Sequence, residues 1–251
     1  MDRFDLASRF TARARHAFAR PVAPKSGIAL PPTNLRMGGT VFKDDAAFLA
    51  GAAADTQKLV DTCGLGSESR LMDWGCGAGR LAIGIAERFG RIARYHGVDV
   101  QQSLIDWANA NIGSRPGYEF TWVDVRNARY NPVGSASKEI PAMSGTYDIF
   151  HAFSVFTHLT AEDAAFYLVE VRRLLAHDGV AWITVFVEEG VDLQHENPKD
   201  YGRLPWKGPL HCVRFERGYF ERLIELANLS VVDFQHGGEA DGQSVYVVTR
   251  R

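Results

Sequence analysis

The sequence predicts an α/β fold built on a doubly wound, mostly parallel sheet. Three observations lead to this prediction. Short apolar segments alternate with segments whose apolar residues recur at three- and four-residue steps, a pattern that favours a parallel sheet with helical crossovers. A glycine-rich turn joins the first of these strands to the first helix. Finally, 46% of the 251 residues are hydrophobic and 23% are charged, which excludes a mainly disordered chain.

The N-terminal part of the chain predicts a helical cap that precedes the alternation. Residues 2–19 place apolar side chains at helical spacing among arginines, and residues 44–63 form a second helix with one apolar face. Between them, residues 21–43 contain Pro and Gly pairs that are typical of a loop. We therefore expect a helical cap or lid over residues 1–66 and a core over residues 67–251.

The core predicts seven strands and the helices that connect them. Helices are expected at 80–89, after the second strand, from a capping arrangement at Thr160, and near the C-terminus. The short connection at 237–242 suits an antiparallel final pair, which makes the sheet mixed. The expected strands are residues 71–74, 95–100, 118–123, 147–153, 180–187, 230–234 and 244–249.

One segment, residues 189–216, interrupts this rhythm and is rich in Gly, Pro and charge. A long irregular connection in a compact domain is more often functional than accidental. We therefore expect residues 1–43 and 189–216 to determine the choice of substrate.

Charge and cysteine content restrict the partners and the compartment. Lys and Arg number 28 against 30 Asp and Glu, so the strongly basic surface of a nucleic-acid-binding protein is not expected. The chain has an odd number of cysteines, Cys63, Cys76 and Cys212, and they are widely spaced, so they fit neither a disulfide framework nor a CxxC metal site. We expect them to be reduced thiols, which indicates a cytoplasmic protein. No apolar run approaches the ~20 residues that span a bilayer, so no membrane partner is expected.

The most informative segment is residues 71–80, Leu-Met-Asp-Trp-Gly-Cys-Gly-Ala-Gly-Arg. A strand enters a glycine loop and continues into a helix, whose N-terminus supplies oriented N–H groups. Gly75 and Gly77 allow a tight turn and close approach to a ligand. The dinucleotide pattern G-x-G-x-x-G requires glycine at the position of Arg80, so this loop departs from that pattern.

Aspartates mark three successive strands beside this loop. Asp73 lies within the first strand, and Asp99 and Asp124 end the second and third. A carboxylate at the position of Asp99 can accept both hydroxyls of a ribose, and Asp124 with an adjacent backbone N–H can pair with an adenine edge. For Asp99 or Asp124 alone, a loop cap is the preferred explanation. Three in order favour a nucleoside site.

With this motif, residues 65–250 resemble the class I S-adenosylmethionine-dependent methyltransferases. The resemblance implies a Rossmann-like sheet in which the last strand lies antiparallel between the fifth and the sixth. It also implies S-adenosylmethionine as cofactor, with its amino-acid part at the glycine loop and its ribose and adenine at the next two strand ends. The cofactor-binding residues that the resemblance implies are Asp73, Gly75, Gly77, Asp99, Val100, Asp124, Val125 and Phe153.

Subclass signals indicate a small acceptor. The segment His151-Ala152-Phe153-Ser154 lacks the Asn/Asp-Pro-Pro-Tyr/Trp motif of nucleic-acid amino-methylases. Residues 154–159 and 31–39 resemble small-molecule and sugar methyltransferases of bacterial secondary metabolism and glycolipid pathways. The resemblance therefore implies methyl transfer to a hydroxyl of a sugar or other small metabolite, by a chain that could form a homodimer. Two alternatives stay open: a protein or tRNA methyltransferase, and a noncatalytic cofactor-binding partner subunit.

His158 is the candidate general base because it follows the fourth strand, where the methyl group is expected. The alternative is a histidine that only bonds its own loop. The acidic run from Glu188 to Glu196 could hold Mg²⁺ through carboxylates and waters, but a solvated loop is the preferred interpretation, so no metal ligand is assigned. The candidate substrate-binding residues are Arg36, His195, Tyr201 and Trp206.

Overall fold

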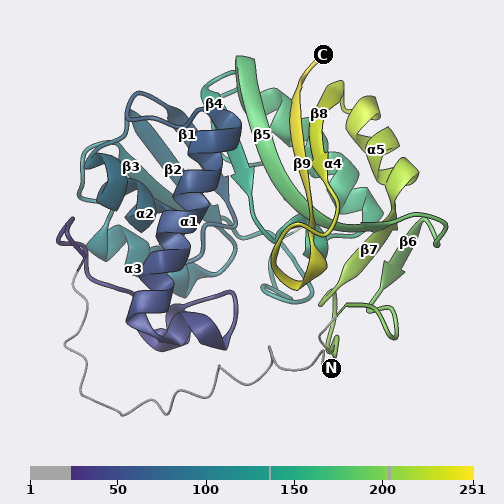
Figure 1. The fold of residues 1–251 in the computed structure, drawn as a ribbon, viewed down its shortest axis with the longest axis horizontal. Coiled ribbons are helices and arrows are strands. Elements are labelled where there is room, and N and C mark those ends of the chain that lie inside the picture. Colours follow the sequence, from purple (N-terminus) through teal and green to yellow (C-terminus); the bar gives the residue numbers. More distant parts are fainter. Residues whose placement is uncertain (1–23, 136, 203–204) are drawn as a thin grey trace, which may run out of the picture.

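The computed structural model describes residues 24–135, 137–202 and 205–251 (Figure 1). The helix expected at residues 2–19 lies outside the described residues. No helix among the described residues is both long and apolar enough to cross a membrane. The helices are α1 (Asp45–Cys63), α2 (Arg80–Phe89), α3 (Gln102–Asn111), α4 (Ala161–Leu174) and α5 (Arg217–Leu226).

All the described strands belong to one sheet of nine. They are β1 (Arg70–Trp74), β2 (Arg94–Asp99), β3 (Tyr118–Trp122), β4 (Tyr147–Ala152), β5 (Leu175–Glu188), β6 (Gln194–Glu196), β7 (Val213–Glu216), β8 (Leu229–Gln235) and β9 (Ser244–Arg250). Short 3-10 turns are η1 (Thr33–Leu35), η2 (Thr40–Lys43), η3 (Phe156–His158) and η4 (Ala240–Gly242).

The sheet order confirms the Rossmann-like arrangement with an antiparallel last strand. Strands β3, β2, β1, β4 and β5 are parallel neighbours in that order. Strand β9 pairs antiparallel with β5 on one side and with β8 on the other. The last strand therefore lies between the expected fifth and sixth strands. The carboxyl ends of β1, β2 and β4 meet at one edge of this sheet, where doubly wound folds bind ligands.

The segment 189–216 is more regular than the sequence predicts, because it contains β6 and β7. Strand β9 covers β5 only as far as Val185, so residues 186–188 of β5 offer an unpaired edge, which β7 fills. Strand β7 has only four residues, too few for a clear alternating signal among the surrounding glycines and prolines. Strand β5 also starts at Leu175, directly after α4, and includes the turn at 178–179 that was expected to precede it.

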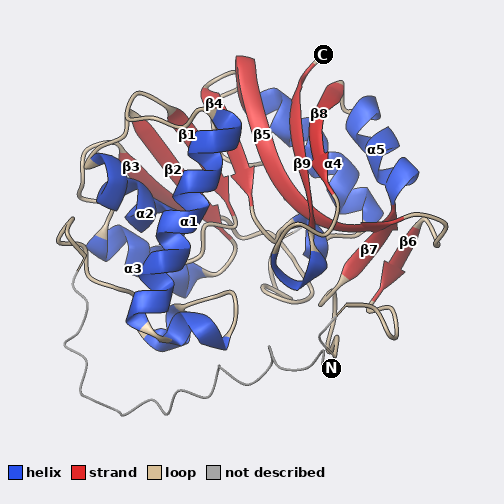
Figure 2. Cartoon of the chain, in the orientation of Figure 1, coloured by secondary structure: helices blue, strands red, loops and turns tan. Residues whose placement is uncertain are grey.

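Helices cover both faces of the sheet (Figure 2). Side chains of α1, α2 and α3 belong to one buried apolar cluster, and those of α4 and α5 belong to the other. Helix α4 begins as predicted, with the Thr160 hydroxyl accepting the Asp163 N–H at 3.2 Å. Helix α1 begins with the Asp44 carboxylate accepting the Ala47 N–H at 2.9 Å and ends at Gly64.

Helix α1 packs very closely on α2, and Gly84 makes this contact possible. A Cβ atom at Gly84 would lie 2.2 Å from the Ala52 carbonyl oxygen and 2.3 Å from Thr56 Oγ1. Only glycine therefore fits. Because α1 shares a core with α2, the described part of the expected cap rests firmly against the sheet that carries the site. The division of the chain at residue 66 stays a prediction.

Candidate active site

A cavity of about 900 Å³ opens at the carboxyl ends of β1, β2 and β4. Residues 35–40, the glycine loop, the segment after β3, the segment after β4 and the β8–β9 connection contribute to its wall. Trp206 and His211 also line it, so parts of both segments expected to choose the substrate reach the cavity. This volume lies within the range of small-molecule and cofactor sites.

The glycine loop turns sharply at the cavity floor. Gly75 has φ +79°, and a Cβ atom there would lie 2.4 Å from Val155 Cγ2, so both the conformation and the space require glycine. The Gly75 N–H donates to the Val98 carbonyl at 2.8 Å, which fastens the loop to β2. This contact brings the loop beside Asp99 at the end of β2.

Asp99 is buried, yet it retains capacity to bind a ligand. Its two oxygens accept the Gly77 N–H at 2.9 Å and the Gln101 N–H at 2.8 Å. A carboxylate oxygen has two lone pairs, so each oxygen can still accept one hydroxyl, as a ribose would require. Burial raises the pKa of Asp99 to about 6, although the two N–H donors oppose that shift. The protein thus holds a carboxylate here at a cost in desolvation.

Asp73 is engaged within the protein. One of its oxygens accepts a hydrogen bond from His151 Nδ1 at 2.8 Å, and the other accepts one from the Tyr95 hydroxyl. The His151 ring stacks on Trp182 with centroids 5.3 Å apart. Asp73, Gly75, Gly77 and His151 all line the cavity, so the geometry is compatible with the predicted place of the cofactor's amino-acid part.

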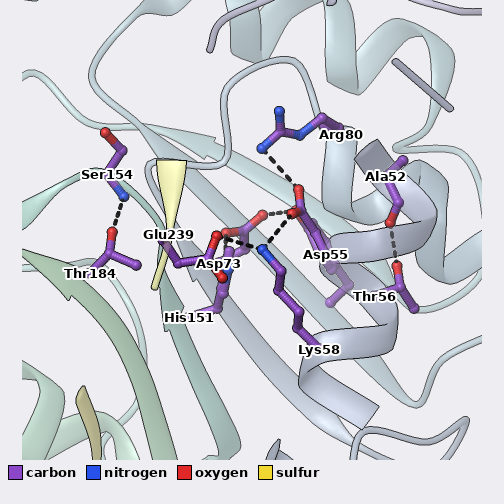
Figure 3. Close-up of polar contacts among 11 residues, drawn as sticks. Ala52, Asp55, Thr56, Lys58, Asp73, Arg80, His151, Ser154, Thr184 and Glu239 are labelled. Atoms are coloured by element: carbon purple, nitrogen blue, oxygen red, sulfur yellow. Dashed lines mark hydrogen bonds and ion pairs between the residues drawn. The ribbon is translucent and has the colours of Figure 1, made fainter. Parts of the chain in front are cut away.

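A network of charged side chains lies at the same end of the cavity, and the sequence did not predict it (Figure 3). Arg80 Nη2 lies 2.8 Å from Asp55 Oδ2, and Lys58 Nζ lies 2.5 Å from Glu239 Oε2 and 4.0 Å from Asp55 Oδ1. Alternating charges of this kind suit a zwitterion such as the amino-acid part of the cofactor. On the sequence, Asp55 and Lys58 look like part of an ordinary solvated helix face, and Glu239 is far away in the chain.

The turn after β4 is held by a ring of three hydrogen bonds, one buried and two partly buried. The Ser154 N–H donates to Thr184 Oγ1 at 2.7 Å, the Thr184 hydroxyl donates to Gln243 Oε1 at 2.6 Å, and Gln243 Nε2 donates to Ser154 Oγ at 3.1 Å. Ser154 adopts φ +56°, which is strained for a residue other than glycine. The ring fixes the direction of Phe153, which lines the cavity and stacks on Trp182.

Only some of the residues predicted to lie near the adenine line the cavity. Val100 and Val125 line the cavity. Asp124 is exposed, accepts a hydrogen bond from Asn131 Nδ2 at 3.0 Å and does not belong to the wall. Its assignment to adenine stays a prediction.

His158 lies in the cavity wall with a defined tautomer. Its Nδ1 lies 2.8 Å from the Leu210 carbonyl oxygen, so Nδ1 carries the proton and Nε2 carries the lone pair. Burial, helped by the charge of Arg129 and opposed by the hydrogen bond to Leu210, lowers the pKa of His158 to about 4. The imidazole is therefore neutral near pH 7, in the form that a general base needs.

Of the predicted substrate-binding residues, too, only some line the cavity. Arg36 lines the cavity, but its guanidinium donates to the carbonyls of Pro31, at 2.7 Å, and Phe42, at 3.2 Å, and to Asp45 Oδ1 at 2.6 Å. Its groups thus fasten the loop before α1. Trp206 lines the cavity and donates its indole N–H to the Tyr201 carbonyl at 2.7 Å.

Tyr201 and His195 are outside the wall. Tyr201 packs edge-on against Phe186, while His195 is exposed and bonds Asp192 at 3.2 Å. The acidic run from Glu188 to Glu196 does not converge on a common point, and within residues 24–135, 137–202 and 205–251 no three His, Cys, Asp or Glu side chains are grouped to hold a metal.

Comparisons with known proteins agree with this geometry. A family model described as a methyltransferase domain matches residues 72–181, the segment that contains the glycine loop, Asp99 and His158. A malonyl-[acyl-carrier protein] O-methyltransferase of Geobacter sulfurreducens is 29% identical over 118 residues, or 47% of this chain. That match spans only 39% of the relative's own length.

Solved structures share the fold at low identity. A [4+2]-cyclase, SpnF, superimposes with a TM-score of 0.57 and 16% identity over 86% of this chain and 84% of its own. A Leishmania major S-adenosylmethionine-dependent methyltransferase gives 0.57 and 16% over 84% and 77% of the two chains. The 1,6-didemethyltoxoflavin-N1-methyltransferase of Burkholderia thailandensis, solved with S-adenosylhomocysteine, gives 0.52 and 19% over 82% and 79%.

The sheet order, the glycine loop beside a buried Asp99 and the matching family model converge on one assignment. The cavity fits S-adenosylmethionine, with charged groups at one end and free lone pairs on Asp99 for a ribose. Residues 72–181 match a methyltransferase domain, and the chain has the fold of the class I S-adenosylmethionine-dependent methyltransferases.

Proposed function

We propose that this chain transfers a methyl group from S-adenosylmethionine to an oxygen of a small metabolite, with a hydroxyl as the preferred acceptor. The observation that carries the proposal is His158, a neutral imidazole in the cavity wall whose tautomer leaves a basic Nε2. The malonyl-[acyl-carrier protein] relative is named as an O-methyltransferase, which supports oxygen as the acceptor atom.

In this mechanism the sulfonium of the bound cofactor supplies an already activated methyl group. The protein's own work is to align the acceptor with that group and to exclude water. His158 Nε2 takes the proton of the attacking hydroxyl, and the Leu210 carbonyl holds the ring by its Nδ1–H. Residues 35–40 and Trp206 line the cavity that receives the acceptor in this proposal.

The fold by itself does not establish methyl transfer, since a [4+2]-cyclase shares it. The first experiment is therefore a screen of metabolite fractions with a methyl-labelled donor, in which labelled product must appear. A chain that binds S-adenosylhomocysteine but labels no fraction would support the noncatalytic partner subunit instead.

On an acceptor found in this way, we expect His158→Ala to lower kcat at least a hundredfold, since a positioned base contributes about 10²–10⁴-fold. Affinity for S-adenosylhomocysteine should stay within threefold of the wild type. The exposed His177 gives the matched control, His177→Ala, which should keep full activity.

The pH profile tests the same role independently. Because burial depresses the pKa of His158 to about 4, the base stays available well below the usual histidine range. With saturating donor, the limb of kcat that depends on His158 should fall near pH 4 and not near pH 6.5. A His158→Ala enzyme that retains most of its kcat would exclude His158 as the base.

A further inference from the structure

Part of the cavity wall carries two arginines that form no ion pair with a described carboxylate. Arg126 and Arg129 follow β3 and both line the cavity. Neither forms an ion pair with a carboxylate in the part of the chain that the structure describes. His158, His211 and Tyr130 belong to the same wall.

Arg129 has donors to spare. Its Nε is buried and finds no hydrogen-bond partner among the described residues. Its Nη1 donates to the Lys207 carbonyl at a long 3.4 Å, and its Cζ lies 5.4 Å from the Tyr130 ring. A guanidinium has five N–H groups, so most of those on Arg129 remain available to a ligand. A buried donor without a partner is destabilising until something binds it.

The other two arginines of the cavity wall near α1 are different. Arg36 is bonded to three backbone carbonyls and to Asp45. Arg80 also has a buried nitrogen, Nη1, without a partner among the described residues, but its guanidinium is paired with Asp55. Their charge is neutralised within the protein. The Asp163 carboxylate, also in the wall, is paired with Lys138 at 2.6 Å, which leaves the charge of Arg129 uncompensated from that direction.

The neighbours of Arg129 are compatible with an anion. The Tyr130 ring, whose centroid lies 5.4 Å from Arg129 Cζ, packs edge-on against the His158 ring with centroids 5.3 Å apart, so Arg129 and His158 flank the same ring. Trp206 packs edge-on against His211 with centroids 5.3 Å apart. An anionic group at Arg129 would therefore lie near His158 and near the aromatic side chains of Tyr130 and Trp206.

We propose that Arg129, helped by Arg126, binds an anionic oxygen group of the methyl acceptor, either a carboxylate or a phosphate. The inference rests on the proposed function, because it places the acceptor in this cavity beside His158. The planar guanidinium suits such a group, since its paired N–H donors match two oxygens at once. The anionic group of the acceptor binds Arg129, and this contact directs the acceptor's separate hydroxyl, the nucleophile, toward His158.

The test uses simple anions on the full chain saturated with S-adenosylhomocysteine. Malonate, its uncharged counterpart malonamide, and inorganic phosphate are titrated by calorimetry, with intrinsic tryptophan fluorescence as a second signal. We expect an anion to bind at least tenfold more tightly than malonamide. Tighter binding of malonate assigns a carboxylate, and tighter binding of phosphate assigns a phosphate.

Two variants and a control assign the binding to Arg129. Arg129→Gln should weaken the anion at least tenfold, while Arg129→Lys, which keeps the charge but loses the fork, should fall between this variant and the wild type. Arg88→Gln, on the exposed face of α2, should bind the anion as the wild type does. Unchanged anion binding in Arg129→Gln, or no anion binding at all, would overturn the proposal. Failure of the wild type to bind S-adenosylhomocysteine would instead refute the proposed function.

Discussion

Asp99 meets two opposing requirements. Burial disfavours its charged form and raises its pKa to about 6, yet the charge makes it the strong acceptor that the predicted contact with ribose hydroxyls needs. The N–H groups of Gly77 and Gln101 reconcile the two, because they stabilise the carboxylate and leave one lone pair on each oxygen. The glycine loop thus stabilises the carboxylate of Asp99 at the end of β2, where the ribose is predicted to bind.

We expect Asp99→Ala to weaken S-adenosylhomocysteine binding at least tenfold, since two charge-assisted hydrogen bonds at ~1.5–3 kcal/mol each are lost. The pKa gives a second check by its sign: the carboxylate is charged above about pH 6 and protonated below it. Affinity of the wild type should therefore fall as the pH drops through 6, and calorimetry on Asp99→Ala should lose this dependence. Asp106→Ala, an exposed aspartate of α3, is the control. Equal affinity of Asp99→Ala and the wild type for S-adenosylhomocysteine would contradict the predicted contact between Asp99 and the ribose.

At the scale of elements, periodicity predicts what is long and regular. Helix α2 has the predicted bounds, and all seven expected strands are present. Most of these strands bury an apolar pattern of several residues, although β8 is largely exposed. Strands β6 and β7 are not predicted, because their short pairing depends on the unpaired end of β5, which no local sequence pattern reveals.

The residues of the site also divide into those that a local sequence motif reveals and those that it does not. The glycine loop and Asp99 carry a local motif, so the sequence finds them. The pairing of Lys58 with Glu239 joins residues 181 positions apart and has no local signal. The composition of the loop at 189–216 suggests a substrate wall, but it does not indicate which aromatic faces inward. Trp206 lines the cavity, whereas Tyr201 packs behind it.

Substrate selection should depend on this loop. Replacing residues 195–206 with a Gly/Ser linker removes Trp206 and most of β6, so turnover should be lost while S-adenosylhomocysteine affinity stays within threefold. A smaller change, Trp206→Ala, should raise KM for the acceptor at least tenfold without a matching change for the donor. Folding is checked by thermal melting of both variants. Full activity of the linker variant on the native acceptor would contradict the assignment.

On the scale of the whole molecule, the cavity is assembled from segments at both ends of the chain. Residues 35–40 and α1 come from its beginning, and residues 239–243 from its end. The Lys58–Glu239 ion pair links α1 to the β8–β9 connection, and Gln243 ties that connection to the turn after β4. A ligand that contacts all of these segments therefore stabilises parts of the fold that are distant in sequence.

This coupling predicts a measurable stabilisation. A ligand at a hundred times its Kd adds about 2.7 kcal/mol to the free energy of unfolding, which for a chain of this size corresponds to a rise in Tm of about 5–10 °C. S-adenosylhomocysteine should produce this shift and should slow amide exchange both near residues 35–40 and near 239–243. Asp99→Ala at the same ligand concentration should show a smaller shift, since its Kd is higher. Protection confined to the glycine loop would mean that the two ends of the chain do not close on the cofactor, and that α1 and the β8–β9 connection only frame the cavity.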